Sequence, residues 1–450
     1  MALSRRLAGF IARTHYEDLP AETAAFTKLC ILDWLGSALA GAAQPPVRMI
    51  DELAREWGGS GQATLVTGGR SSIVNAALVN GAASHVVELD DIHKASIVHA
   101  ATVVIPAALA AAEWLNRSGK ELIAAVAVGY DVCFRVGEAV SPSHYRFWHN
   151  TATCGTFGAA AAAASLLRLD EEQIVHALGN AGTQAAGLWE FIVDGAMSKQ
   201  LHTGKAAMNG LLAVLLAQKG FTGPSRILEG ERGFFRAMAE TVDESRITDR
   251  LGESFKITEN SFKIHASCRH THPAVDLALK LRRQTGIRPE EIRRIRVGGY
   301  RSVLAITDNP DPQTVYAAKF SLQFCVALAL VKGRAGLADF SEETLHDPAV
   351  RSLMERVALT LDPDVDAAYP ECWGSSLEAE TVEGEVLRLA ADYPKGDPEN
   401  PVTAAELTEK FHDLAAHLPE DTRRSYLETI LHLESLADVG RFWGERSRVS

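Results

Sequence analysis

The chain has 450 residues, of which 47% are hydrophobic and 23% are charged, a composition that suits a soluble globular protein of two or more domains. Its formal net charge of −12 at pH 7, with no stripe of lysine and arginine, argues against nucleic acid or an anionic membrane as a partner. The sequence shows no secretory signal and no uninterrupted membrane-spanning run, so we expect a cytoplasmic protein.

The chain before Lys263 follows the helical period of hydrophobic residues almost throughout. Alanine-rich stretches such as 157–169 carry little side-chain bulk, which lets neighbouring helices approach closely. These features predict a compact multi-helix domain with a buried centre. Helices are predicted within 4–43 and at 45–57, 73–88, 101–116, 119–138, 151–168, 170–187 and 204–219.

The pattern changes after Lys263. Two segments, 290–303 and 375–393, alternate apolar and polar residues as half-buried strands do. Within the second segment, Glu383 and Gly384 are typical of a hairpin tip. This part of the chain therefore predicts a small sheet.

Helical signals return around this sheet, at 317–333 and 404–418, and a polar, proline-containing link at 395–403 precedes the second of them. We therefore expect a mainly α protein, with a large all-helical domain formed by both chain ends and a smaller α+β domain. The predicted domain ranges are 1–265 and 401–450 for the helical domain and 266–400 for the smaller domain.

Two familiar kinds of cofactor site are absent from the sequence. The six cysteines form no C-x-x-C pair, so an iron–sulfur cluster or a structural zinc ion held by cysteine is not expected. No GxGxxG or Walker-type loop supports nucleotide binding. These absences give no support for a nucleotide cofactor or a cysteine-bound metal.

A polar cluster lies between two apolar helical runs in residues 75–115. Ionisable residues in such surroundings usually have a function. Other interpretations remain open: His85 could be a hydrogen-bonded core residue, Asp90 and Asp91 could end one helix and cap the next, and the group has metal-compatible residue types. The cluster consists of His85, Glu88, Asp90, Asp91, His93 and His99.

Basic residues recur at predicted helix starts elsewhere in the chain. Helix N-termini offer unpaired backbone N–H groups and a partial positive charge, so each can bind an anion. If the fold brings these starts together, they form a basic pocket in an acidic protein, and a small di- or tricarboxylate is the natural occupant. The residues are His99 before 101, His149 before 151, Lys199 before 204, and His270 and His272 beside Pro273.

Seven segments stand out in order along nearly the whole chain: ILDWLGSALAG (31–41), NGAASHVVELDD (80–91), H-N-T-x(3)-G-T-F-G from His149, SKQLHTGKAAMNGLLAVLLAQKGFTGP (198–224), KIHASCRHTHP (263–273), AKFSLQFCVALAL (318–330) and KGDPENPVTAAELTEKF (395–411). Together they resemble the MmgE/PrpD family, which includes 2-methylcitrate dehydratase, cis-aconitate decarboxylase and iminodisuccinate epimerase. The resemblance implies a helical domain with a smaller α+β lid, a homodimer, and no metal or iron–sulfur cluster.

The resemblance also implies an active site between the two domains. Three departures from the family pattern stand out: Glu88 where members often have aspartate, Ile92 where they often have threonine, and His99 followed by Ala100 and Ala101 where members have proline and a small residue. Ile92 lacks a hydroxyl that could contact a substrate. The matching positions are Glu88, Ile92, His99, His149, Lys199, Lys263, Cys268 and His272.

The activities of this family share chemistry at a carbon next to a carboxylate, which needs an acid or base of near-neutral pKa and cations that hold developing negative charge. We expect His99 to be the acid/base, because a helix N-terminus disfavours protonation of its ring. The other expected roles are carboxylate binding by Lys199 and Lys263, assistance by His149 and His272, and orientation of a histidine by Asp91 or Glu88.

The resulting prediction is a cofactor-independent lyase, most simply a dehydratase of a 2-methylcitrate-like hydroxy polycarboxylate. A decarboxylase or an epimerase could use the same site. A different class of function is also open: a non-catalytic carboxylate-binding relative, in which Ile92 and the altered surroundings of His99 have removed the activity.

Overall fold

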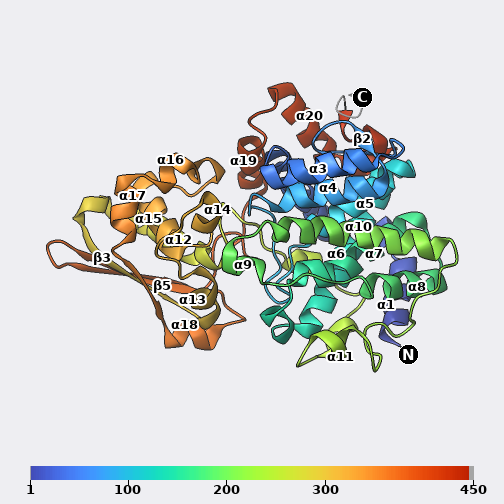
Figure 1. Ribbon diagram of the computed structural model, residues 1–450, viewed down its shortest axis with the longest axis horizontal. Helices are drawn as coiled ribbons and strands as arrows, with labels where there is room; N and C mark the ends of the chain where they lie inside the picture. Colours follow the sequence, from blue (N-terminus) through green and yellow to red (C-terminus); the bar gives the residue numbers. More distant parts are fainter. Residues whose placement is uncertain (1, 445–450) are drawn as a thin grey trace. The chain divides into compact units, whose positions relative to one another are not determined.

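The computed structural model describes residues 2–444, which form two compact units (Figure 1). Unit 1 comprises Met1–Asn260 and Thr403–Ser450, and unit 2 comprises Ser261–Val402. Both chain ends thus belong to unit 1. The two junctions lie at 260/261 and 402/403, where the sequence suggested 265/266 and 400/401.

Unit 1 is built from helices that pack side by side: α10 contacts α4, α5 and α7, α5 contacts α4 and α7, and α6 packs against α7 (Figure 1). The mainly α fold expected from the helical period is therefore correct. The helices are α1 (Leu3–Arg13), α2 (Ala21–Gly41), α3 (Pro45–Trp57), α4 (Ile73–His85), α5 (Ala101–Trp114), α6 (Gly119–Val140), α7 (Asn150–Leu167), α8 (Glu171–Gly182), α9 (Phe191–Asp194), α10 (Ser198–Gln218), α11 (Phe234–Met238), α19 (Ala404–Leu414) and α20 (Glu420–Leu431).

Several details of unit 1 differ from the sequence prediction, and two of them affect its layout. The unit is not all-helical, because the short strands β1 (Ala63–Thr64) and β2 (Arg70–Ser71) pair antiparallel. The turn between them uses Gly68 at φ 102° and Gly69 at φ 78°, a conformation that glycine adopts readily. Helix α10 also starts at Ser198, six residues before the predicted position, so Lys199 lies in its first turn.

Helix α2 has the length and hydropathy of a membrane span, with a mean hydropathy of 1.2 over its most apolar window. However, 72% of that window is buried inside the structure, and the helix packs against α4, α6 and α19. The core helix of a soluble protein has the same properties, so α2 is weak evidence for a membrane location.

Helices α4 and α10 touch backbone to backbone through two glycines. A Cβ atom on Gly81 would lie 2.9 Å from the Cα of Gly204, and a Cβ atom on Gly204 would lie 2.3 Å from the carbonyl oxygen of Leu78. This close approach brings the first turn of α10, with Lys199, beside the loop that follows α4.

We expect Gly204→Ala to lower the free energy of unfolding by about 1–3 kcal/mol, because the added methyl group forces the two backbones apart and outweighs the better helix propensity of alanine. Urea unfolding followed by circular dichroism measures this change. Gly61→Ala is the matched control, since its Cβ would meet Arg70 at an ordinary 3.4 Å, and its effect should stay within about 0.5 kcal/mol. Equal effects of the two substitutions would show that the helix contact is not tight.

A buried arginine fastens an irregular segment of unit 1 to α6. Arg135 and Asp131 are both fully buried and form an ion pair with 2.6 Å between Nε and Oδ2. Asp131 also accepts a hydrogen bond from the backbone N–H of Lys256 at 2.8 Å. The segment fixed in this way leads directly to Asn260. The Arg135 guanidinium donates to the carbonyl oxygens of Arg246, Asp249 and Ser254 at 3.3, 2.5 and 3.4 Å.

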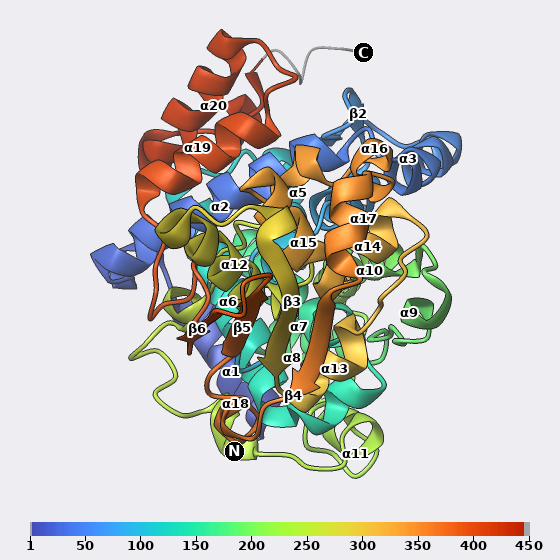
Figure 2. The ribbon, with the colours of Figure 1, turned by 90° about the vertical axis from the view of Figure 1, so that its left-hand side faces the viewer.

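Unit 2 contains a four-stranded sheet in the order β4-β3-β5-β6, with β3 parallel to β4 and antiparallel to β5 (Figure 2). Helix α12 packs on β5 and β6, and α15 packs on β4. The predicted hairpin is confirmed, with Gly384 at φ 89° between β5 and β6. The strands are β3 (Ile292–Gly299), β4 (Val357–Leu361), β5 (Ser375–Thr381) and β6 (Val386–Ala391).

The helix predicted at 317–333 is interrupted in the structure. It consists of two helices, and Ser321 begins the second of them by accepting a hydrogen bond from the N–H of Phe324 at 3.1 Å. The helices of unit 2 are α12 (His272–Thr285), α13 (Arg301–Thr307), α14 (Val315–Ala318), α15 (Leu322–Lys332), α16 (Glu342–Leu345), α17 (Pro348–Met354) and α18 (Pro363–Ala368).

Candidate active site

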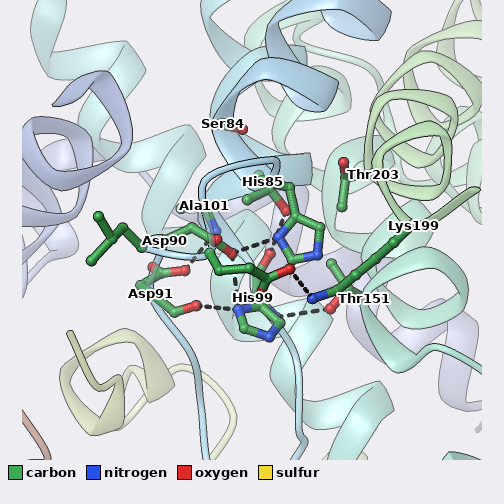
Figure 3. Close-up of polar contacts among 12 residues, drawn as sticks. Ser84, His85, Asp90, Asp91, His99, Ala101, Thr151, Lys199 and Thr203 are labelled. Carbon is green, nitrogen blue, oxygen red and sulfur yellow. Dashed lines mark hydrogen bonds and ion pairs between the residues drawn. The ribbon is translucent and has the colours of Figure 1, made fainter. Parts of the chain in front are cut away.

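The loop between α4 and α5 brings two histidines onto one carboxylate. Oδ2 of Asp90 lies 2.8 Å from Nδ1 of His85, the last residue of α4, and 2.9 Å from Nδ1 of His99, just before α5 (Figure 3). His85 and Asp90 are fully buried, whereas 11% of the His99 side chain is exposed. Asp90 therefore bridges the two rings.

The surroundings of His99 fix where its ring hydrogen lies. Nδ1 is 2.6 Å from the main-chain oxygen of Asp91 and 2.9 Å from the Asp90 carboxylate, and both of these groups accept hydrogen bonds. Nδ1 must therefore carry the hydrogen, which leaves the lone pair of the neutral ring on Nε2. His99 is thus arranged to take up or deliver a proton at Nε2.

The Asp91 carboxylate contacts three hydrogen-bond donors, none of them a histidine ring. Oδ1 accepts from the N–H of Ala101 at 3.1 Å, at the start of α5, and Oδ2 accepts from the Tyr130 hydroxyl at 2.7 Å and the Asn260 amide at 2.6 Å. Burial raises the pKa of Asp91 to about 7, and the nearby charges of Asp33 and Asp90 add to this effect. The carboxylate thus joins α5, α6 and the end of the segment that Arg135 fastens.

This raised pKa predicts a pH-dependent stability. Between the ordinary pKa of 3.8 and about 7, the folded protein keeps a proton on Asp91 that the unfolded chain releases. Raising the pH through this window should therefore lower the free energy of unfolding, by up to about 4 kcal/mol from this group. Urea unfolding at several pH values tests this prediction. Asp91→Asn is the comparison variant, because it lacks the carboxyl group that titrates. A stability difference between variant and parent that does not change with pH would contradict the prediction.

Lys199 and Glu88 form a buried ion pair between α10 and the loop after α4. Their side chains are only 3% and 1% exposed. Glu88 adopts φ 60°, a left-handed conformation that costs energy for a residue other than glycine. Figure 3 shows Lys199 reaching towards His85 and His99. The ammonium group of Lys199 therefore lies beside the two imidazoles, with its charge balanced by Glu88.

Two more histidines adjoin this group. The ring of His149, the residue before α7, stacks on that of His85 with centroids 5.6 Å apart, and its Nδ1 lies 3.3 Å from Nδ1 of His202 on α10. Burial, and then the charge of His85, hold the pKa of His149 well below its ordinary value. Burial also lowers the pKa of His202 to about 4. Both rings are therefore neutral near pH 7.

The Lys410 side chain connects the returning C-terminal part of the chain to this loop. Its ammonium group donates to the carbonyl oxygen of Leu89 at 2.6 Å and to Asp33 on α2 at 2.5 Å. Helix α19 thus holds the loop that carries Glu88 and Asp90.

Three of the residues suggested for the site lie in unit 2. His272 opens α12, and its two ring nitrogens lie 3.0 Å from the Arg269 guanidinium and 3.3 Å from the carbonyl oxygen of Ser267. Burial, and then the charge of Arg269, hold the pKa of His272 well below its ordinary value. Lys263 and Cys268 are both buried in the same unit. The six others lie in unit 1: Glu88, Asp91, Ile92, His99, His149 and Lys199.

Sequence reasoning placed His85 and Asp90 in the polar cluster, with structural roles as open alternatives, but did not include them or His202 among the site residues. The bridging position of Asp90 depends on how the loop folds, and no spacing rule indicates it. His202 did carry a usable signal, because it follows Lys199 by three residues and so lies on the same face of α10.

Two groups in the described part of the chain have metal-compatible side chains: His85 with Asp90 and His99, and His93 with Glu138 and Glu259. In the first, the separations of 2.8 and 2.9 Å are hydrogen-bond lengths, shorter than the roughly 3.4 Å between ligands of a tetrahedral zinc ion. In the second, the Lys256 ammonium lies 3.0 Å from Glu138 and 3.3 Å from Glu259. Both groups therefore have the geometry of hydrogen-bonded networks.

Comparison with known proteins gives matches over both units. A sequence model described as the MmgE/PrpD N-terminal domain matches residues 5–246, and one described as the MmgE/PrpD C-terminal domain matches residues 265–435. The cis-aconitate decarboxylase-like protein oryM of Aspergillus oryzae is 29% identical over 97% of this chain and 95% of its own length. Cis-aconitate decarboxylase of Aspergillus terreus is 28% identical over 94% and 91%. 2-Methylcitrate dehydratase of Salmonella typhimurium is 25% identical over 60% and 59%.

Proposed function

Because this chain belongs to the MmgE/PrpD family, we propose that it is a cofactor-independent lyase that acts on a small di- or tricarboxylate at the carbon next to a carboxylate. Relatives named as dehydratases and as decarboxylases support a lyase-type enzyme. The first candidate reaction is dehydration of a 2-methylcitrate-like hydroxy acid.

The observation that carries the proposal is the arrangement of His99. Its Nδ1 is held by two acceptors, its Nε2 is the remaining acid/base atom, and the Lys199 ammonium lies in the same cluster. In dehydration, a neutral imidazole removes the proton next to the carboxylate, and a cation stabilises the negative charge that develops on that carboxylate. A substrate carboxylate would approach Lys199 in competition with Glu88.

Decarboxylation of a cis-aconitate-like acid is the second candidate. It is favoured by the extent of the matches, because two relatives of that name cover more than nine-tenths of both chains, whereas the dehydratases match 52% to 72% of this chain. In this reaction the histidine would deliver a proton to the carbon that loses carbon dioxide. Epimerisation would need the same proton transfers without loss of a group.

A proton NMR time course in deuterated buffer distinguishes these reactions. The panel is 2-methylcitrate, citrate, cis-aconitate, malate and aspartate-derived acids. A vinyl signal that grows from a hydroxy acid identifies dehydration, and a new vinyl product from cis-aconitate with release of carbon dioxide identifies decarboxylation. Deuterium exchange without a new compound identifies an epimerase. Tight binding with no reaction of any compound would contradict the lyase and favour a non-catalytic carboxylate-binding relative.

A further inference from the structure

We propose that Asp90 is a positioning residue that couples His85 to His99, so that the two imidazoles share one proton and His85 supplies a second acid/base nitrogen. This inference deepens the proposed function and rests on it for the role in turnover. The arrangement of the ligand-free site, however, can be tested without any substrate.

The first support is geometric. A single oxygen, Oδ2 of Asp90, lies within 2.9 Å of Nδ1 of both rings, and the ring centroids are 5.0 Å apart. An ionised carboxylate only accepts hydrogen bonds, so both nitrogens must donate to it. His85 and His99 are then fixed in the same tautomer, each with its hydrogen on Nδ1.

The second support is a buried ring nitrogen of His85 that has no hydrogen-bond partner in residues 2–444. This atom is Nε2, and it is fully buried with the rest of the side chain. Leaving a buried polar atom without a partner is costly, so such an atom in a native structure calls for a function or a bound molecule. The Nε2 atom of the stacked His149 is also buried and without a partner in the same described range. Two adjacent orphan nitrogens mark a place for a polar substrate atom or a water molecule.

The third support is charge balance. One desolvated carboxylate can stabilise one imidazolium, but a second proton would place two positive charges about 5 Å apart at the cost of their mutual repulsion. A second proton should therefore bind to the pair less readily than the first. The ionisable groups around it are the Lys199–Glu88 ion pair, the neutral rings of His149 and His202, and Asp91, Asp33 and Tyr130 on the side of α2 and α6.

A pair with one shared proton suits a reaction that takes a proton and gives one back. In dehydration, the neutral ring removes the proton from the carbon at its Nε2, and the carbon–oxygen bond breaks with its electrons moving onto oxygen. The charged ring then gives its Nε2 proton to that oxygen, which leaves as water. The pair ends with one proton, now on the other ring. In decarboxylation the pair gives its proton to carbon and regains one from solvent.

The test is nitrogen NMR of the ligand-free protein with ¹⁵N-labelled histidine, recorded from pH 5 to 9. We expect His85 and His99 both to carry hydrogen on Nδ1 and to titrate together in two steps. Asp90→Asn should remove the shared titration, and Asp90→Glu should restore it in part. Glu113→Gln is the matched control, because it also replaces a buried carboxyl of unit 1, and this carboxyl accepts hydrogen bonds from Thr64 and Trp443 rather than from either ring.

His85→Gln provides an independent variant if Asp90→Asn does not fold. It keeps Asp90 in place, and the titration of His99 should become a single step. Hydrogen on Nε2 of either neutral ring, or a His99 titration unchanged in His85→Gln, would overturn the proposal.

A kinetic test applies once a substrate has been identified. Asp90→Asn should then lower kcat by about 10²–10⁴-fold with little change in KM, and an unchanged kcat would contradict the proposal. If no compound of the substrate panel reacts, the proposed function is contradicted, whereas the NMR result on the ligand-free protein still decides whether the two histidines are coupled.

Discussion

Replacing His99 by glutamine should lower kcat by about 10²–10⁴-fold on any compound of the proposed substrate panel that the protein turns over, the range that a positioned acid/base usually contributes. Glutamine keeps most of the side-chain volume but cannot exchange a proton near neutral pH. The rate is measured by the proton NMR time course, and binding by the shift in Tm that the compound causes. We expect that shift to persist in the variant, because Lys199 remains.

The control is His144→Gln, which removes another buried histidine of unit 1. Both ring nitrogens of His144 are used structurally, with Met238 O at 2.9 Å and Thr153 Oγ1 at 2.7 Å. Its substitution should reduce stability and leave kcat nearly unchanged. If His99→Gln kept more than about a tenth of the activity, His99 would not be the acid/base.

Replacing Arg135 by methionine should lower the free energy of unfolding by about 3–5 kcal/mol, because it leaves the Asp131 carboxylate buried without its counter-ion. Three backbone carbonyls of the segment before Asn260 lose their donor at the same time. Urea unfolding measures the change. The segment also carries the amide that binds Asp91, so the site should loosen with it.

Arg424→Met is the matched control, since Arg424 pairs with Glu420 at the same helical spacing but both side chains are exposed. That variant should lose less than about 0.5 kcal/mol. The double variant Arg135→Met with Asp131→Asn should recover part of the stability, because no uncompensated charge remains. Equal losses for Arg135→Met and Arg424→Met would show that burial of the ion pair has no energetic consequence.

The helices were predictable where apolar residues recur with the helical period. The stretch 198–203, SKQLHT, offers a single leucine, so the first turn of α10 was missed although it carries Lys199. Strands β1 and β2, with two residues each, are too short for an alternating pattern. The hairpin at Gly384 was predictable because its strands are long and alternate.

The sequence was enough to predict which loop and which helix starts form the site. It was not enough to predict which atoms contact one another. Asp90 and Asp91 are neighbours, and sequence alone does not tell which carboxylate faces the histidines. The answer depends on the loop, where Glu88 and Ile97 take left-handed conformations at φ 60° and 53°. The roles of the site residues, the homodimer and the cytoplasmic location stay predictions.

If Lys199 binds a substrate carboxylate as proposed, its ion pair with Glu88 has a consequence for selectivity. Glu88 would be a competitor held in place by the chain, with an effective concentration at the ammonium group far above that of a free carboxylic acid. A compound with a single carboxylate would gain too little from one contact to displace it. A polycarboxylate bound at several points would make the exchange at Lys199 an intramolecular event. The proposed function therefore predicts that Glu88 discriminates against simple carboxylic acids.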